Sequence, residues 1–92
     1  MAGEVVNNEA EQRYELAAGG AVAIAAYRRE GGRILFTHTE VPGELEGRGI
    51  GSRLVAGALD DVRRRGLKAV PLCSFVAHYV ETHPEVQDLA AD

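Results

Sequence analysis

A glycine-rich stretch directly ahead of an amphipathic segment is the part of this sequence whose residue types and spacing best suit chemistry. Gly47, Gly49 and Gly51 stand at alternate positions, and residues 50–65 repeat apolar side chains at helical spacing. Glycines let backbone N–H groups approach an anion closely, and the first turn of a helix adds unpaired donors and the positive end of its dipole. The stretch therefore predicts a cradle for a phosphate or pyrophosphate group.

Two familiar phosphate-binding motifs do not fit this stretch. A Walker A loop requires a lysine directly after its last glycine, and here Ser52 follows Gly51. The dinucleotide fingerprint requires a glycine where Ser52 stands, and an acidic residue about 20 positions further on, where residues 67–73 contain none. Both interpretations fail on specific residues.

The elements on either side of the glycines must hold them in place, and the sequence pattern predicts what these elements are. Glycine pairs at 19–20 and 31–32 predict turns between strands, and Gly66 is expected to end the long helix as its C′ residue. The segment after Gly66 should return parallel to the strand before the glycines, as in a β–loop–α–β unit. The expected strands are residues 13–17, 21–28, 33–41 and 67–72, and the expected helices are residues 50–65 and 74–81, with another beginning at His83-Pro84.

Alternation along the strand of residues 33–41 predicts which side chains share a face. In a regular strand successive side chains point to opposite faces of the sheet. His38 and Glu40 should therefore lie on the face of Ile34 and Phe36, and the other face should carry Leu35, Thr37, Thr39 and Val41.

Length, composition and charge indicate one acidic globular domain. The 92 residues carry a formal net charge of −4, with 46% hydrophobic and 26% charged residues, which is typical of a soluble domain. The negative charge argues against a nucleic-acid partner, and no apolar run approaches the roughly 20 residues that span a bilayer. Residues 1–8 are polar and expected to be disordered, ahead of a single domain over residues 9–92.

Cysteine usage and the start of the sequence bear on the compartment. Cys73 is the single cysteine of the sequence, which excludes an internal disulfide and any site with several cysteine ligands. The first eight residues lack the basic and apolar regions of a signal peptide. We therefore expect a cytoplasmic protein, a monomer or weak dimer, without a metal site, since His78 and His83 lack ligand spacing.

The glycine stretch, together with two flanking segments, resembles one enzyme superfamily. Residues 47–52, which follow a strand end at Val41, resemble the acetyl-CoA loop of the GNAT N-acetyltransferases, whose motif is Gln/Arg-x-x-Gly-x-Gly/Ala. Gly49 and Gly51 match the two small positions, and Glu46 stands where Gln or Arg is usual. Residues 36–42 and 72–79, with His83-Pro84, are similar in the same order to the minimal, YjdJ-type GNAT group, so the resemblance covers residues 14–89.

This resemblance implies a fold and a cofactor. The expected fold is α/β (α+β), a mixed, mostly antiparallel sheet with helices packed on its faces. The loop amides should hold the pyrophosphate of acetyl-CoA, while the strand end at Thr39–Val41 pairs with its pantetheine arm. The residues expected at the cofactor are Val41, Glu46, Gly47, Arg48, Gly49, Ile50, Gly51, Ser52, Ser74 and Tyr79.

Three residues, His38, Glu40 and Cys73, are the main candidates for catalysis, and Tyr79 is a further one; each has a purely structural alternative. His38 and Glu40 lie on the strand that ends at the loop and could relay a proton, or could be a half-buried histidine and a solvated carboxylate. Cys73 could lie near the acetyl group and accept it in a ping-pong reaction, or could be a small buried apolar residue. Tyr79 could act as a general acid, although its spacing from Phe75 also suits packing.

The predicted function is transfer of an acetyl group from acetyl-CoA to a primary amine, either on a protein (a lysine or the N-terminus) or on a small molecule. Two alternatives remain at this point. One is a non-catalytic module that binds CoA or acyl-CoA, which would need the loop but neither His38 nor Cys73. The other is a small interaction domain in which the glycines only form a tight turn.

Overall fold

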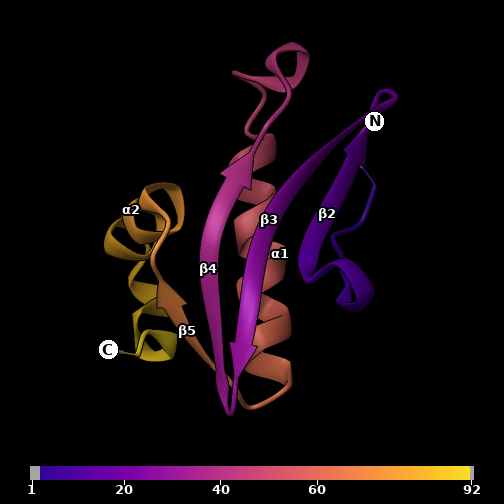
Figure 1. Cartoon of the computed structure of the whole chain (residues 1–92). Coiled ribbons are helices and arrows are strands. Elements are labelled where there is room, and N and C mark those ends of the chain that lie inside the picture. The colour runs from indigo at the N-terminus through magenta and orange to yellow at the C-terminus, as the bar shows by residue number, and fades with distance from the viewer. Residues whose placement is uncertain (1–2, 92) are drawn as a thin grey trace.

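A five-stranded sheet whose strands follow one another in chain order is the frame of the molecule (Figure 1). The computed structural model describes residues 3–91. Strands β1 to β4 pair antiparallel, whereas β5 pairs parallel with β4. The elements in order are β1 (Val6–Asn8), the 3₁₀ turn η1 (Glu9–Glu11), β2 (Arg13–Ala18), β3 (Ala21–Glu30), β4 (Arg33–Glu40), the 3₁₀ turn η2 (Gly43–Leu45), α1 (Ile50–Arg64), β5 (Lys68–Pro71), α2 (Ser74–Thr82) and the 3₁₀ segment η3 (Pro84–Leu89). The predicted α+β class with a mixed, mostly antiparallel sheet is confirmed.

Glycines with positive φ form the two tight turns of the sheet. Gly19 and Gly20 connect β2 to β3 with φ values of +55° and +83°, and Gly31 connects β3 to β4 with φ of +59°. Only glycine adopts this backbone region without steric cost. The predicted hairpin between residues 21–28 and 33–41 is confirmed as β3–β4.

Helix α1 lies against one face of the sheet and leads the chain back to β5. Its inward stripe is fully buried at Leu54, Val55, Ala58, Leu59 and Val62, as the helical spacing of these residues predicts. Gly66 follows the C-cap residue with φ of +70° and ends the helix as predicted. The expected parallel return is also confirmed, with Leu35 of β4 beside Val70 of β5.

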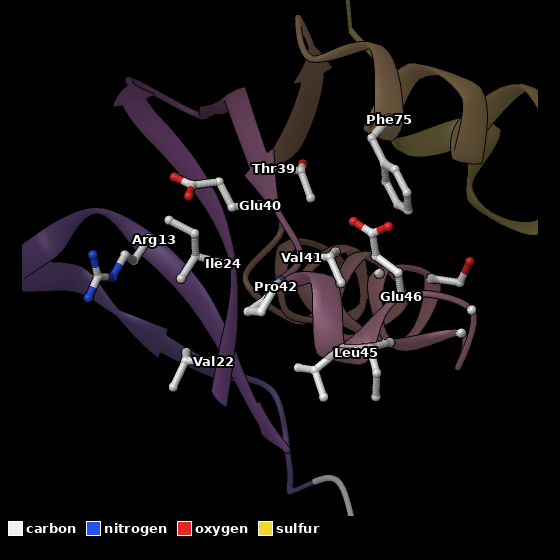
Figure 2. A pocket seen from close by; sticks show the side chains of 15 residues that line it. Arg13, Val22, Ile24, Thr39, Glu40, Val41, Pro42, Leu45, Glu46 and Phe75 are labelled. Carbon is white, nitrogen blue, oxygen red and sulfur yellow. The ribbon is translucent and has the colours of Figure 1, made fainter. Parts of the chain in front are cut away.

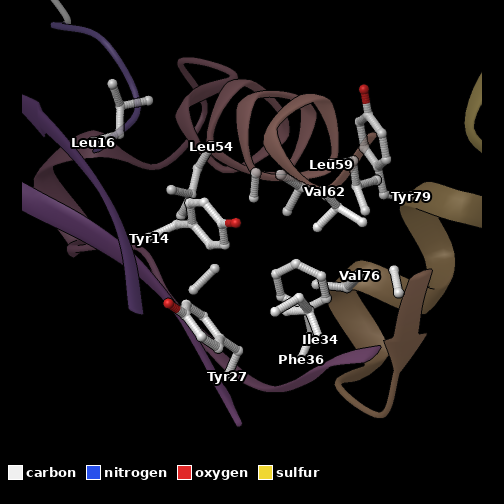
Figure 3. Packing of buried hydrophobic residues seen from close by; sticks show 14 of the residues in the cluster. Tyr14, Leu16, Tyr27, Ile34, Phe36, Leu54, Leu59, Val62, Val76 and Tyr79 are labelled. Carbon is white, nitrogen blue, oxygen red and sulfur yellow. The ribbon is translucent and has the colours of Figure 1, made fainter. Parts of the chain in front are cut away.

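The core lies between this face of the sheet and α1, and α2 closes its side (Figure 3). Three rings pack together at its centre, with Tyr14 and Tyr27 centroids 5.3 Å apart and Tyr14 and Phe36 centroids 6.1 Å apart. The hydroxyl of Tyr14 donates a hydrogen bond of 2.7 Å to Asp61, a buried carboxylate of α1. Burial of the tyrosine, and then this bond, hold the pKa of Tyr14 far above its ordinary value. The contact ties β2 to the helix that carries the glycine loop.

A β-bulge in β4 changes the prediction of which side chains share a face. Phe36 pairs with Tyr27, but His38 pairs with Ala26, so Thr37 is an extra residue in β4. Because one extra residue reverses the alternation, Thr39 pairs with the core residue Ala25 and lies on the face of Ile34 and Phe36. His38 and Glu40 lie on the opposite face, which corrects the sequence-based assignment. Simple alternation cannot reveal a bulge.

The N-terminal segment also differs from its predicted disorder, because residues 3–8 run along the sheet. Gly3 N–H donates to Ala17 O at 2.9 Å, and β1 pairs with β2 from Val6 to Asn8. Val5 packs on Gly57 of α1, where an added Cβ would lie 2.4 Å from a Val5 methyl group. The polar composition of this segment gave no indication that its backbone pairs with β2. Residues 1–2 of the predicted disordered segment lie outside the described residues.

Among residues 3–91, no helix is both long enough and apolar enough to cross a bilayer.

Candidate active site

Three glycines shape the loop before α1 for two different reasons. Gly47 and Gly49 have φ values of +80° and +72°, so the path of the chain requires them. Gly51 is already helical, and there the requirement is space, because an added Cβ would lie 2.6 Å from the ring tip of Phe75. Glycines therefore form the path of the loop into α1, and the Phe75 ring of α2 lies against the glycine of the first helical turn.

The N-terminus of α1 carries backbone donors and no capping side chain. The first helical bond runs from Arg53 N–H to Gly49 O at 3.0 Å, so the N–H groups of Ile50, Gly51 and Ser52 precede the helical ladder. Gly49 is the N-cap, and the first turn contains no acidic residue. Such an end attracts anions through its donors and its dipole. This backbone suits a pyrophosphate group, as the sequence resemblance implies.

A cavity of about 850 Å³ opens at this helix end and continues around the end of β4 (Figure 2). Its loop side is formed by the glycines and by Leu45, and Phe75 faces it from α2. Its sheet side reaches Arg13, Val22 and Ile24. The predicted site residues that line the cavity are Glu40, Val41, Glu46, Gly47, Gly49, Ile50, Gly51 and Ser52.

Glu46 places a carboxylate in the cavity at the irregular position of the glycine motif. Figure 2 shows its side chain between Val41 and Phe75, pointing toward Thr39. A carboxylate this close to the cradle opposes an anion and attracts a cation. Any affinity of this helix end for an anion must therefore come from its backbone N–H groups.

The other predicted cofactor residues, Arg48, Ser74 and Tyr79, are not among the residues that line this cavity. Arg48 is exposed, and Ser74 is the first residue of α2, outside the cavity lining. Tyr79 lies between α2 and α1, where it lines a separate cavity with Arg63 and Asp88. Its ring stacks on His83, with centroids 3.7 Å apart. The packing role for Tyr79 fits this position, and its general-acid role stays a prediction.

Cys73 and Thr39 meet where β4 and β5 diverge. Pairing of the two strands stops at Phe36 and Pro71, and Cys73 N–H then donates to Phe36 O at 2.9 Å. Thr39 Oγ1 lies 3.3 Å from Cys73 Sγ. Cys73 thus occupies the fork between the strands, immediately before the first turn of α2.

The surroundings of Cys73 favour its thiolate. Partial burial opposes the charge, but the Thr39 hydroxyl and the backbone N–H groups of Val76 and Phe75 outweigh it, so the pKa of Cys73 lies below its ordinary value. Helix N-termini lower cysteine pKa values in this way. The half-buried thiol is therefore more acidic than an ordinary cysteine, as a nucleophile or a proton donor would need to be.

His38 and Glu40 form one pair on the open face of β4. His38 Nε2 lies 3.1 Å from Glu40 Oε2, and the side chains are 60% and 63% exposed. Because of the bulge, β4 stands between this pair and the Thr39–Cys73 contact. Glu40 lines the cavity from the sheet side, whereas His38 does not. The three predicted catalytic residues therefore surround the end of β4 from two faces.

Several residues of the site were missed by sequence reasoning. Phe75 was assigned to packing, and its contact with Gly51 depends on how α1 and α2 meet. Thr39 was named only as part of the strand end, and its place beside Cys73 follows from the bulge. Sequence spacing carried no signal for the cavity residues on the first hairpin or after β4, which are Arg13, Val22, Ile24, Pro42 and Leu45.

Metal-ligating side chains do not gather in this structure. Over residues 3–91, no three histidine, cysteine, aspartate or glutamate side chains are placed to hold a metal ion.

Comparison with known proteins agrees with this geometry. A family model described as GCN5-related N-acetyl-transferase matches residues 13–89. Protein NATD1 of Gallus gallus and that of Homo sapiens are each 41% identical over 68 residues, which is 73% of this chain. The chain covers only 62% and 60% of the lengths of these two relatives.

A solved structure extends the similarity to the whole fold. The NMR solution structure of a GCN5-like protein from Staphylococcus aureus matches with a TM-score of 0.75 and 28% sequence identity. The match covers 96% of this chain and 87% of that chain. Because the family model covers most of the sequence, and its fold and glycine loop are present, this chain belongs to the GCN5-related N-acetyltransferase family of enzymes.

Proposed function

We propose that this protein transfers the acetyl group of acetyl-CoA to a primary amine. The observation that carries the proposal is the uncapped N-terminus of α1, which opens through Gly47 and Gly49 into the cavity around the end of β4. Membership of the family supports acetyl-CoA as the donor. The lone cysteine of the sequence agrees with a reducing, cytoplasmic setting.

Backbone groups are the part of the chain suited to hold the cofactor. The N–H groups of Ile50, Gly51 and Ser52 would bind the pyrophosphate, and the edge of β4 beyond its pairing with β5 would bind the pantetheine arm at Thr39 to Val41. Bound acetyl-CoA would supply an activated acetyl group and a thiol leaving group. The fork between β4 and β5 is where Cys73 and Glu40 approach the same strand end from opposite sides.

In this scheme, side chains of the protein accept and donate the protons of the reaction. In the overall reaction the N–C bond forms as the thioester C–S bond breaks, and the ammonium loses two protons, one to the departing thiol and one to solvent. Glu40, with His38 beside it, would accept the first proton from the ammonium. Cys73 would either protonate the departing thiolate or accept the acetyl group itself and pass it to the amine.

Binding of CoA is the first test, and Ser52 offers a selective variant. Ser52 is an exposed residue of the first turn of α1 that lines the cavity. Ser52→Glu should preserve or raise stability by about 0.3–1 kcal/mol, because an acidic residue suits a helix N-terminus. The same carboxylate should weaken CoA binding about tenfold or more by repelling the pyrophosphate.

Calorimetric titration and thermal unfolding measure the two effects separately. The wild-type protein should gain about 2.7 kcal/mol at a CoA concentration of about 100 Kd. Ser52→Gln, which adds similar size without charge, should bind CoA nearly as well as the wild type. A flat thermal response up to millimolar CoA, or equal CoA affinity of the Glu and Gln variants, would exclude the cradle.

The rival function is a module that binds CoA or acyl-CoA without catalysis. Transfer to an amine distinguishes it, so product should be measured by mass spectrometry with wild type and with Cys73→Ala. An acetylated intact protein that depends on Cys73 and discharges to added amine indicates the covalent route. Retained turnover in Cys73→Ala indicates direct transfer, and CoA binding without turnover of any amine favours the rival.

A further inference from the structure

Residues 3–8 form an N-terminal arm that lies along the edge of β2. The strand β1 within this arm pairs antiparallel with β2. Val5 packs on Gly57 of α1, and Asn7 Oδ1 accepts a hydrogen bond of 2.6 Å from the Tyr27 hydroxyl of β3. We call the surface of β2, β3 and α1 that holds the arm the arm seat. Every copy of the chain carries the same seat, so the seat can hold the arm of a second copy with the same contacts.

A four-residue hinge, residues 9–12, turns the chain from the arm into β2. It consists of η1 and Gln12, and all four of its residues are exposed. Gln12 has a φ of +53° and is the only residue other than glycine with a positive φ among residues 3–91. This left-handed conformation is unfavourable for a residue with a Cβ atom. The tight turn of the hinge is therefore strained at Gln12.

The strand β3 has an unpaired edge beside this hinge. Its pairing with β2 stops at Arg13 and Ala26, whereas β3 continues to Glu30 (Figure 1). Tyr27 N–H donates to Gln12 O at 2.9 Å, and beyond it no described strand pairs with residues 28–30 on this side. If the β2–β3 register continued, hinge residues 12, 11, 10 and 9 would lie opposite residues 27, 28, 29 and 30. An extended hinge could therefore complete this edge of the sheet.

We propose that the protein forms a dimer in which two copies exchange their N-terminal arms. In this dimer the hinge is extended, so residues 6–18 form one continuous strand in each copy. The two long strands pair antiparallel about a two-fold axis at the hinge. Val6 of one copy lies opposite Glu15 of the other, as it lies opposite its own Glu15 in the monomer. A second copy is the partner because its arm carries the valine that fits the space at Gly57.

The hinge decides between the monomer and the dimer, because the contacts of the arm with its seat are the same in both. Opening breaks two backbone-donated bonds of 3.2 Å, from Gln12 N–H to Glu9 O and from Glu11 N–H to Asn8 Oδ1. It also breaks an exposed ion pair of 3.2 Å between Arg65 and Glu9. In return it relieves the left-handed residue and pairs the hinge with the edge of β3. Strained short hinges favour such an exchange, and a higher protein concentration shifts the balance to the dimer.

Two substitutions at Gln12 should move this equilibrium in opposite directions. Gln12→Gly removes the steric cost of the turn, and it should raise the Kd of the dimer about 25-fold if each of the two hinges contributes about fivefold. Gln12→Val should lower the Kd, because a β-branched residue favours extended backbone. Glu11→Gly is the matched control, since it adds a glycine to the same hinge at a position without a positive φ. Its Kd, measured like the others by sedimentation equilibrium, should stay much closer to that of the wild type.

Cysteines on separate chains test the exchange of the arm directly. One chain carries Val6→Cys and the other Glu15→Cys, each with Cys73→Ser so that no other thiol is present. The two chains are unfolded, mixed, refolded at high concentration and oxidised with glutathione disulfide. In the exchanged dimer the new thiols face each other across paired strands, so a disulfide-linked heterodimer should form. Val22→Cys in place of Val6→Cys controls for random collision, because Val22 is 46% exposed and lies outside the arm.

Three results would overturn the inference. The first is a wild-type protein and a Gln12→Val variant that both stay monomeric at millimolar concentration. The second is cross-linking of the Val6 and Glu15 variants that is no faster than in the Val22 control, which would mean that any dimer uses another surface. The third is an equal dimer Kd for Gln12→Gly and the wild type, which would mean that the hinge does not set the balance. CoA enters none of these measurements, so they do not depend on the proposed function.

Discussion

At the residue scale, the contact between Thr39 and Cys73 should set the reactivity of the thiol. The hydroxyl of Thr39 lies 3.3 Å from the sulfur and favours the thiolate, contributing to the lowered pKa of Cys73. A lowered pKa means that the thiolate is already populated at a pH where an ordinary cysteine is still protonated. In Thr39→Val the midpoint of the alkylation rate against pH should therefore move upward, and the rate at neutral pH should fall.

Iodoacetamide labelling followed by intact mass measures this midpoint without any assumption about catalysis. Thr37→Val is the matched control, since Thr37 is an exposed threonine of the same strand whose hydroxyl donates to Ala26 O at 3.4 Å. Its midpoint should equal that of the wild type. Identical midpoints for both variants would mean that the helix N-terminus alone sets the thiol chemistry.

At the element scale, Gly51 and Phe75 join the first turns of α1 and α2. Because an added Cβ at residue 51 would lie 2.6 Å from the tip of the Phe75 ring, which is 40% exposed, Gly51→Ala should displace the ring and cost up to about 1 kcal/mol of stability. In a Phe75→Ala background the same change should gain up to about 1 kcal/mol from helix propensity. A double-mutant cycle by urea unfolding should give a coupling energy of about 1 kcal/mol or more.

The acetyl-CoA loop motif accepts either glycine or alanine at the position of Gly51. The cycle therefore also tests whether this chain requires glycine there. CoA affinity of the four proteins should be measured in parallel by calorimetry. Additive effects on stability, with a coupling energy near zero, would show that the ring moves aside without cost and that Gly51 is not required by Phe75.

At the scale of the whole molecule, the N-terminal segment packs on α1, where Val5 contacts Gly57. A glycine-to-alanine change inside a helix gains about 1 kcal/mol when the site is open. Here the new Cβ would lie 2.4 Å from Val5 Cγ2 and 2.6 Å from Val5 Cβ. Gly57→Ala should therefore lose stability, and it should release residues 3–8 from the sheet.

Thermal unfolding and limited proteolysis test this closure. Cleavage within residues 3–8 should be faster in Gly57→Ala, and Val5→Ala combined with Gly57→Ala should recover part of the loss by removing the contacting methyl groups. A gain in stability in the single variant would contradict the contact, because it would mean that the segment is not held on the helix.

Much of the fold could be predicted from local pattern. The glycine pairs gave the turns of the sheet, the apolar stripe gave α1, and Gly66 gave its end, because each depends on residues close in sequence. The loop was found for the same reason, since Gly47 and Gly49 are needed by the conformation of their own backbone. The segment ahead of β2 was not predicted, because its order comes from pairing with β2 and packing on α1.

The sequence by itself determined the glycine loop and the order of the elements around it, since both follow from short-range backbone constraints and apolar spacing. Only the tertiary structure decided which side chains face the site. One extra residue at Thr37 turned His38 and Glu40 to the open face and brought Thr39 to Cys73. It also placed Glu40 beside Ile24 of β3, in a cavity that Arg13 of β2 lines as well. A bulge and a strand register are properties of paired chains, so no single segment of the sequence contains them.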